Sequence, residues 1–465
     1  MPCGPQAAGP HGTPATLESR TMRYTFVGLG HRAQMYVDAL LGAWRDTGEI
    51  VALCDPNRTR LGYHLDRIGR AVPCFAPEEF GKALDLADAV VVTTVDAAHA
   101  GYVLAALDAG KDVVVEKPLC TTAEDCAAIL AAAERGAGRL VVTFNYRYSP
   151  RNSAVRRLIA DGAIGDVTSV HFSWALDTIH GADYFRRWHR DRANSGGLLV
   201  HKAAHHFDLV NWWIDDAAAS VYAQSSLRFY GAANARARGL TDRPARARHA
   251  PDLGTDPFLL DLSADPRLKR LYLDAEHEDG YFRDQDVFGE GVTIDDNMAV
   301  LVRYERGALL TYSLNAHAPA EGYHAVFNGT AGRLELEVVE RAWTPPHAAI
   351  DPTAAGKEHA AGASERLVLH RHWREPEEIP IEGGAGAHGG GDALLLDDVF
   401  RGPADDPLAR QAGHRAGVAS VMIGISAGLS AESGAPVALT AGGTRLAGLM
   451  PGEFPGLAET LAGHL

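Results

Sequence analysis

The chain has 465 residues, of which 46% are apolar and 22% charged, and this length favours two domains over a single core. Its formal net charge of −15 argues against nucleic acid or an anionic membrane as a partner. The five cysteines include no CxxC pair, so neither a disulfide framework nor a structural zinc site is indicated. No apolar run approaches a membrane span and no signal-peptide pattern is present, so we expect a cytoplasmic protein.

The N-terminal region begins with a biased segment and continues into a glycine motif. Residues 1–21 are rich in Pro, Gly, Ala, Ser and Thr, and we expect a disordered tail with Met22 as an alternative start. The apolar run that follows ends in Gly28-x-Gly30-x-x-Ala33 and leads into a helical pattern. This order predicts a strand, a tight turn and a helix, and an ordinary β–turn–α corner is the alternative interpretation.

In a dinucleotide site of this kind, Gly28 makes the turn and Gly30 lets a pyrophosphate approach the backbone. The helix N-terminus supplies N–H groups for the phosphates, and we include His31 and Arg32 among the cofactor-binding residues.

A second apolar strand, at 50–54, is followed directly by Asp55. A carboxylate at this distance from the glycines binds the adenosine ribose hydroxyls and repels a 2′-phosphate. We therefore predict NAD as the cofactor. Arg58 lies close behind and could accept a 2′-phosphate, which keeps NADP as the less favoured alternative.

Alternating strands and helices continue, with strands predicted at 89–94, 112–115 and 140–144 and helices at 99–109 and 123–135. Continuous apolar strands of this kind are typical of a parallel sheet buried on both faces. Ligands of such sheets bind at the carboxyl ends of the strands, where Thr94 and Lys117 lie with the glycine turn and Asp55. We predict a Rossmann NAD-binding domain over 22–149, and we add His99 and Glu116 to its cofactor-binding residues.

From about residue 149 the strand candidates alternate, at 167–176, 219–230, 298–304, 308–314, 324–328, 333–339 and 366–370. Alternation favours an antiparallel sheet with one covered face. Helices are expected at 198–214, 393–400 and 415–431, an insertion at 229–297, and Gly-, Ala- and His-rich loops at 343–365 and 383–391. The predicted fold class is α/β: a doubly wound Rossmann domain, then an α+β domain over 150–465 with a large, mainly antiparallel open sheet.

The motif Glu116-Lys117-Pro118 ends the predicted strand at 112–115. A lysine at this place points toward the nicotinamide, where burial and nearby cations lower its pKa and its charged form stabilises an alkoxide. We predict that Lys117 is catalytic, and a surface loop lysine is the alternative.

The helix at 198–214 places His201, His205 and Asp208 on one face, with Lys202 and His206 on the adjacent face. These histidines and the aspartate could ligate a metal, but no further ligand is signalled, so we predict no metal site. Structural histidines are a second alternative. Because histidine titrates near neutrality, we predict acid–base roles for His205 and His201 and substrate contacts for Lys202 and His206.

On these motifs the chain resembles the glucose–fructose oxidoreductase / inositol dehydrogenase / rhizopine-catabolism (Gfo/Idh/MocA) family from Met22 onward. The resemblance implies that the EKP lysine and a helix aspartate–histidine pair handle a substrate hydroxyl while hydride passes to or from the nicotinamide. Lys117 and His205 stand at two of these positions. His201 stands where the family usually has aspartate, so a histidine pair would replace the carboxylate–histidine pair.

Two further segments carry candidate substrate residues. At the predicted domain junction, Tyr146, Arg147 and Tyr148 suit stacking on a sugar, and the resemblance places them near the cleft; packing between domains is the alternative. Arg187 and Trp188 belong to a cationic cluster at 184–192 that could hold an anionic substrate group. Alternatively, these arginines pair with carboxylates of the protein itself, for which the candidates are Asp284, Asp286, Asp295 and Asp296.

The sequence thus predicts an NAD-dependent oxidoreductase acting on a CH–OH group of a sugar, glycoside or cyclitol. A first alternative is an NAD-dependent glycoside hydrolase or epimerase that oxidises its substrate transiently, and a second is a non-catalytic nucleotide-binding regulator. The expected partners are a small-molecule carbohydrate and further copies of the chain, in a dimer or tetramer formed through the C-terminal sheet.

Overall fold

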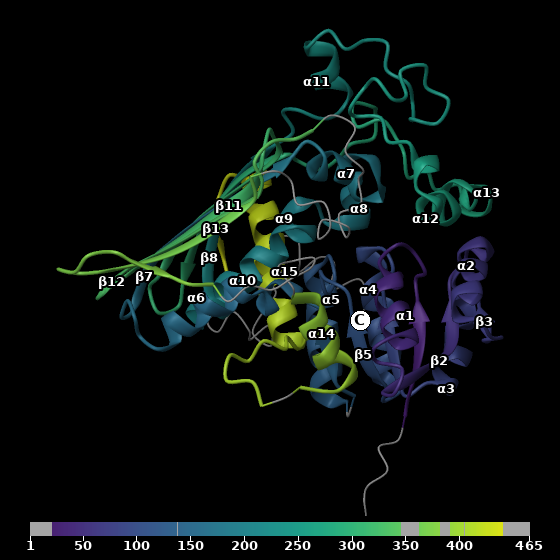
Figure 1. Cartoon of the computed structure of the whole chain (residues 1–465), viewed down its shortest axis with the longest axis horizontal. Coiled ribbons are helices and arrows are strands. Elements are labelled where there is room, and N and C mark those ends of the chain that lie inside the picture. Colours follow the sequence, from purple (N-terminus) through teal and green to yellow (C-terminus); the bar gives the residue numbers. More distant parts are fainter. Residues whose placement is uncertain (1–20, 137, 346–361, 382–390, 404, 440–465) are drawn as a thin grey trace, which may run out of the picture.

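The computed structural model describes residues 21–439 except 137, 346–361, 382–390 and 404, and it contains two sheets (Figure 1). The first is parallel, with the order β3-β2-β1-β4-β5-β6. Its strands are β1 (Met22–Val27), β2 (Gly48–Cys54), β3 (Cys74–Phe75), β4 (Ala89–Val92), β5 (Asp112–Val115) and β6 (Leu140–Val142). The order and the buried central strands β4 and β5, of which only Asp112 is partly exposed, confirm the predicted doubly wound α/β sheet.

The helices of this sheet are α1 (Ala33–Leu41), α2 (Arg58–Ile68), α3 (Phe80–Leu86), α4 (His99–Asp108) and α5 (Ala123–Arg135). Side-chain caps fix two of the starts: the Asn57 side chain accepts from the third residue of α2, and Thr122 accepts from Asp125 in α5. A distant helix, α14 (Gly391–Phe400), also packs here, and its Phe400 ring lies edge-on to Tyr24 of β1 at 5.3 Å. The second half of the chain therefore contributes to the core of the first sheet.

The second sheet has nine strands in the order β14-β13-β12-β11-β7-β10-β9-β8-β15. Its strands are β7 (Val167–Asp177), β8 (Ala218–Ser226), β9 (Asn297–Tyr304), β10 (Leu309–Ala318), β11 (Glu321–Gly329), β12 (Gly332–Arg341), β13 (Ser364–Arg371), β14 (Glu377–Ile379) and β15 (Val437–Ala438). All neighbours are antiparallel except β7 and β10. Buried and exposed residues alternate, as in β9, so one face is covered and the other is open.

The remaining helices are α6 (Pro150–Ala160), α7 (His180–Arg186), α8 (Arg192–Ser195), α9 (Leu198–His201), α10 (Ala203–Ile214), α11 (Ala232–Ala237), α12 (Pro266–Leu268), α13 (Glu276–Asp279) and α15 (His414–Ser433). Helices α10 and α15 pack together on the covered face of the sheet. The helix predicted at 198–214 is interrupted at Lys202, which separates α9 from α10.

Helix α15 corrects the expectation that no apolar run approaches a membrane span, because its length and composition would allow it to cross a membrane. In the structure 56% of its apolar window is buried, against β8, α10 and α5. Its small residues permit this close packing: a Cβ on Gly424 would lie 2.3 Å from the Leu199 carbonyl oxygen, and one on Gly417 would lie 2.9 Å from Val142. The apolar run is thus a core helix that joins the two sheets.

The insertion predicted at 229–297 contains α11, α12, α13 and the π-helix η6 (Lys269–Leu273). Its second half lies beside α2 of the first sheet, on the right in Figure 1. The predicted tail at 1–21 lies outside the described residues except for Thr21, as do most of the predicted loops at 343–365 and 383–391.

Candidate active site

A cavity of about 530 Å³ opens at the carboxyl ends of β1, β2, β4 and β5. The N-terminal sheet supplies one wall, α7, α9 and α10 supply the opposite wall, and the insertion closes one end. The strand order reverses between β1 and β4, the place at which doubly wound sheets bind their ligands.

The glycine turn fits a dinucleotide. Gly28 has φ +80°, and a Cβ there would lie 2.6 Å from the backbone of Thr94, so only glycine suits the position. Gly30 also lines the cavity, and a Cβ on it would point toward the Tyr272 hydroxyl at 3.6 Å. His31 and Arg32 follow in the same wall. The structure therefore brings the predicted phosphate-binding residues together.

Asp55 lies 6% exposed at the end of β2, in the cavity wall. Its carboxylate accepts from the N–H groups of Leu29 at 2.7 Å and Asn57 at 2.8 Å. Burial raises the pKa of this carboxyl, and the two N–H donors oppose the shift. Arg58 is not part of the wall; the arginine beside Asp55 is Arg60, with Nη1 4.0 Å from Oδ1, because the turn of α2 directs position 60 inward. This corrects the expected place of the cationic side chain.

The predicted Glu116 and His99 anchor the strand ends around the cavity. Arg32 Nε donates to Glu116 Oε1 at 2.5 Å, and the Tyr36 hydroxyl donates to the same oxygen at 2.6 Å. Burial alone would raise the pKa of Glu116, but Arg32 and Tyr36 hold it below its usual value. The His99 ring bridges the carbonyl oxygens of Pro118 at 2.8 Å and Thr94 at 3.3 Å.

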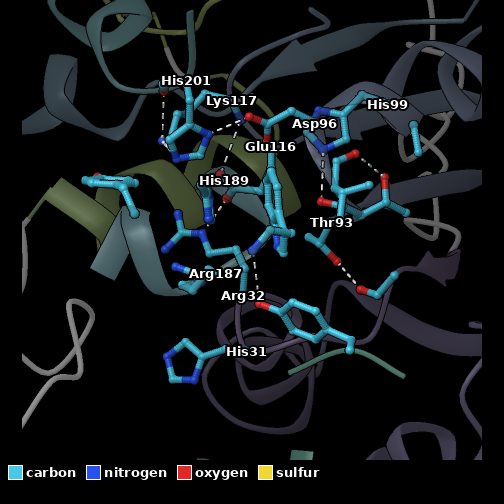
Figure 2. A pocket seen from close by; sticks show the side chains of 18 of the residues that line it. His31, Arg32, Thr93, Asp96, His99, Glu116, Lys117, Arg187, His189 and His201 are labelled. Atoms are coloured by element: carbon cyan, nitrogen blue, oxygen red, sulfur yellow. Dashed lines mark hydrogen bonds and ion pairs between the residues drawn. The ribbon is translucent and has the colours of Figure 1, made fainter. Parts of the chain in front are cut away.

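Lys117, His201 and Asp96 form a chain across the cavity (Figure 2). Lys117 Nζ lies 3.5 Å from His201 Nε2 and donates to the His201 carbonyl oxygen at 3.3 Å. On the other side of the ring, His201 Nδ1 lies 2.5 Å from Asp96 Oδ2. The lysine and the aspartate lie in the segments that follow β5 and β4 of the Rossmann domain, whereas the histidine comes from α9.

The ionisation of this chain follows from its burial. Burial, together with neighbouring cations, lowers the pKa of Lys117 to about 8. It also lowers the pKa of His201 and raises that of Asp96 well above its usual value. The two shifts bring the proton affinities of the imidazole and the Asp96 carboxylate closer together, which favours transfer of a proton between them.

A second group of cavity residues consists of Lys202, His205 and Tyr146. The His205 ring stacks on the Tyr146 ring at 4.5 Å. Lys202 Nζ donates to the Tyr146 hydroxyl at 3.3 Å and lies 4.7 Å from the centre of the Trp174 ring. Burial lowers the pKa of Lys202 to about 7. Three groups able to bind or exchange protons with hydroxyls therefore face one space.

Arg147, Tyr148 and His206, which we predicted to contact the substrate, do not line the cavity. Each has a partner elsewhere: Arg147 forms a buried two-pronged ion pair with Asp208, the Tyr148 hydroxyl donates to Asp398 at 2.7 Å, and His206 Nδ1 lies 2.7 Å from the Tyr312 hydroxyl. These contacts correct the sequence expectation. The ion pair also removes Asp208 from any metal set with His201 and His205.

The cationic segment at 184–192 divides into two parts. Arg187 and Trp188 line the cavity, where Arg187 pairs with Asp183 at 3.2 Å and the Trp188 ring stacks on His189 at 3.6 Å. The other arginines bind the protein itself: Arg192 pairs with a carboxylate, as the alternative interpretation stated, whereas Arg186 and Arg190 donate to backbone carbonyl oxygens. Their partners are the Phe258 carbonyl for Arg186, the Asp286 and Glu290 carbonyls for Arg190, and the Asp295 carboxylate for Arg192.

Several residues of the cavity wall were not predicted from the sequence. Asp96 follows the end of β4 by four residues, so the rule that ligands bind at strand ends could have found it. His180 and His189 also face the cavity, and Tyr272 and Asp279 reach it from the insertion, where no local pattern marks them. Within the described residues, no three His, Cys, Asp or Glu side chains are grouped to hold a metal ion.

Comparison with known proteins places these features in a family. Residues 22–144 match the NAD-binding Rossmann fold of the Gfo/Idh/MocA oxidoreductase family, and residues 156–439 match its C-terminal alpha/beta domain. The chain is 34% identical over 415 residues to the protein named "Putative oxidoreductase YteT" from Bacillus subtilis (strain 168), covering 86% of this chain and 93% of the relative.

A second relative is the inositol 2-dehydrogenase/D-chiro-inositol 3-dehydrogenase of Halalkalibacterium halodurans, 32% identical over 43% of this chain and 55% of the relative. Among solved structures, the WlbA dehydrogenase from Bordetella pertussis in complex with NADH and UDP-GlcNAcA shares the fold. Its TM-score is 0.60 at 19% identity, covering 91% of this chain and all of that chain. The chain belongs to the Gfo/Idh/MocA oxidoreductase family, with an NAD(P)-binding Rossmann domain and a C-terminal alpha/beta domain.

Proposed function

We propose that the protein moves hydride between NAD and a secondary hydroxyl of a sugar, glycoside or cyclitol. The observation that carries the proposal is the chain Lys117–His201–Asp96, which lies in the same cavity as the glycine turn and Asp55. The names of two relatives support the substrate class, because one is an inositol dehydrogenase and the other a dehydrogenase bound to a sugar nucleotide.

The cavity residues suit NAD as the hydride carrier. Gly28, Gly30 and the start of α1 would hold its pyrophosphate, and Asp55 its adenosine ribose. When bound, the nicotinamide supplies the acceptor or donor of the hydride. The remaining chemistry, which is removal of the hydroxyl proton and stabilisation of the alkoxide, belongs to the protein.

We propose that Lys117 takes the proton of the substrate hydroxyl during oxidation. His201 Nε2 can then receive a proton from Nζ while the proton on Nδ1 passes to Asp96, so that one proton moves along the whole chain. The ionised carboxylate of Asp96 is the final acceptor, and its raised pKa means that it binds this proton more readily than an exposed aspartate would. During reduction the same proton returns through His201 to Lys117 and to the new hydroxyl.

His205 and Lys202 are proposed to orient the sugar beside this chain. His205 occupies the position that the family resemblance gives to the acid–base histidine, and it keeps the prediction of a catalytic role. Lys202 and the Tyr146 hydroxyl offer donors for neighbouring hydroxyl groups.

The test is a screen for NADH formation across neutral sugars, glycosides and cyclitols with the purified chain. A substrate of this class should give NADH absorbance with the native chain and at least a 10²-fold lower rate with Lys117→Ala. Lys82→Ala is the matched control, since Lys82 is exposed and pairs with Glu79. Turnover by Lys117→Ala equal to that of the native chain would overturn the proposal.

A second candidate function is glycoside cleavage or epimerisation through transient oxidation. Lys202 favours it, because this lysine has a pKa of about 7 and faces the same cavity as Lys117. Elimination next to a newly formed ketone needs a further base for a C–H proton, and a lysine that is neutral near pH 7 is suited to that task.

The predicted homo-oligomer would use the open face of the nine-stranded sheet. Leu301 of β9 and Leu309 of β10 are 53% and 54% exposed there, and Tyr222 of β8 adds an exposed aromatic ring. Contiguous apolar side chains on an open sheet suit an interface between copies of the chain.

A further inference from the structure

The insertion of the C-terminal domain reaches the cofactor end of the cavity. Its Tyr272 hydroxyl accepts from the N–H group of His31 in the glycine turn at 3.0 Å. Its Glu278 carboxylate accepts from the first N–H groups of α2, those of Arg58 at 2.6 Å and Thr59 at 2.9 Å. The wall beside Asp55 is therefore built from both domains.

We infer that Asp279 of this insertion belongs to the cofactor site and, by neutralising Arg60, sets the preference for a dinucleotide without a 2′-phosphate. The inference rests on the proposed use of a nicotinamide dinucleotide in this cavity. It goes beyond the role of Asp55, because it assigns cofactor selection to a residue about 220 positions away in the other domain.

Arg60 is the cation that a 2′-phosphate would meet. It lies 8% exposed in the cavity wall, with Nη1 4.0 Å from Asp55 Oδ1. Nε donates to the Leu271 carbonyl oxygen at 3.1 Å, and Nη2 is buried without a hydrogen-bond partner in the described part of the chain. A guanidinium beside the ribose diol is the group that binds a 2′-phosphate in NADP-dependent proteins.

Asp279 holds this guanidinium in an ion pair. Its Oδ2 accepts from Arg60 Nη1 at 2.6 Å and from Asn57 Nδ2 at 3.0 Å. Its Oδ1 accepts from the N–H group of Tyr281 at 3.1 Å, so the carboxylate is fixed at both oxygens. Asp279 also lines the cavity.

The charges beside Asp55 determine whether the site accepts a ribose diol or a 2′-phosphate. Asp55 and Asp279 provide two carboxylates for the single guanidinium of Arg60, which leaves a net negative wall at the ribose. A neutral diol can hydrogen-bond to such a wall, whereas a phosphate dianion is repelled by it. Removal of the Asp279 charge leaves one carboxylate and one guanidinium, and Arg60 becomes available to the phosphate.

The experiment measures dissociation constants of NAD and NADP by fluorescence titration, without substrate. Asp279→Asn keeps the size and the acceptor oxygen, and we expect it to tighten NADP binding about 10-fold while NAD binding changes less than about 3-fold. Asp274→Asn is the matched control in the same insertion, since Asp274 is partly exposed and pairs only with Lys269 among the described residues. It should leave both constants unchanged.

Two further variants isolate the role of Arg60. Asp279→Asn combined with Arg60→Gln should cancel the gain in NADP affinity, and Arg60→Gln alone should weaken NADP binding below that of the native chain. Thermal unfolding of each variant establishes that it is folded. A dissociation constant for NADP within 2-fold of the native value in folded Asp279→Asn would overturn the inference. It would also be overturned if the double variant bound NADP as tightly as Asp279→Asn does.

The titration separates this inference from the proposed function. Absence of NAD binding by the native chain would contradict the proposed function itself. Normal NAD binding with no effect of Asp279→Asn would contradict only the assignment of Asp279.

Discussion

His201 Nδ1 lies 2.5 Å from Asp96 Oδ2, and this contact joins α9 of the C-terminal domain to the segment after β4 of the Rossmann domain. The family resemblance gives an aspartate at the helix position that His201 occupies here. The structure supplies a carboxylate from the opposite wall, with the imidazole between it and Lys117. The carboxylate is thus retained in the hydrogen-bonded series, but it comes from Asp96 and lies behind the imidazole of His201.

Asp96→Asn tests this arrangement. The amide can still meet His201 Nδ1, but it cannot accept a proton, so we expect the rate of hydride transfer to fall by about 10² with NAD affinity nearly kept. Steady-state turnover and an NAD titration measure the two quantities. Asp85→Asn, an exposed change on α3, is the control. A variant with native turnover would show that the proton does not reach Asp96.

Lys117 sets a pH dependence. Its pKa is lowered to about 8, mainly by burial, and only its neutral form can take the hydroxyl proton. The value of kcat/KM for alcohol oxidation should therefore rise with pH through about 8 and level off above it. For ketone reduction, which needs the charged form, kcat/KM should fall over the same range. A profile that is flat between pH 6 and 10 in both directions would contradict a titrating lysine in the free enzyme.

His205 lines the same cavity as Lys117, and its catalytic role stays a prediction. Lys117→Ala and His205→Ala should each lower turnover by on the order of 10² or more, with little change in NAD affinity. His277→Ala, on the exposed surface of the insertion, serves as a histidine control. Full activity of His205→Ala would remove that residue from the catalytic mechanism.

The sequence predicted which residues lie at the strand ends of this site better than it predicted their long-range side-chain pairings. Gly28, Asp55 and Lys117 could be placed because strand ends and the glycine pattern are local features, and each lines the cavity. Arg147 could not be placed, since its direction depends on a buried pairing with Asp208, 61 positions away. The role of Asp279 could not be predicted for the same physical reason. Its contact with Arg60 depends on how the insertion packs against α2, and this packing produces no periodic pattern in the sequence.

Lys202 should lower the stability of the folded protein. Burial lowers its pKa from 10.5 to about 7, so between these values the unfolded chain binds the proton and the folded chain does not. The penalty is full below about pH 7 and vanishes above about 10.5. Lys202→Met should therefore raise the free energy of unfolding by roughly 1–3 kcal/mol at pH 7 and by less at pH 10. Thermal unfolding of the cofactor-free protein at the two pH values measures this, and a lower Tm at pH 7 would contradict it.

The last prediction separates net dehydrogenation from transient oxidation, and it concerns the number of proton carriers in the cavity. A dehydrogenase removes one proton from one hydroxyl, for which Lys117 and its chain suffice. Cleavage through a C3 ketone also needs a base for the C2 proton and an acid for the leaving group. His206 cannot be this further acid or base, because it is buried against Tyr312. Lys202 can, because it lies in the cavity and its pKa is lowered to about 7.

A glycoside substrate in deuterated water distinguishes the two routes. We expect one NADH per oxidised sugar and no deuterium at C2, because the chain Lys117–His201–Asp96 provides a complete route for the single proton of a dehydrogenase. Deuterium at C2 of the released sugar, together with turnover that consumes no NAD, would contradict net dehydrogenation and select the transient route. In that case Lys202→Met should abolish the exchange at C2 while the first oxidation, followed as NADH in a single turnover, persists.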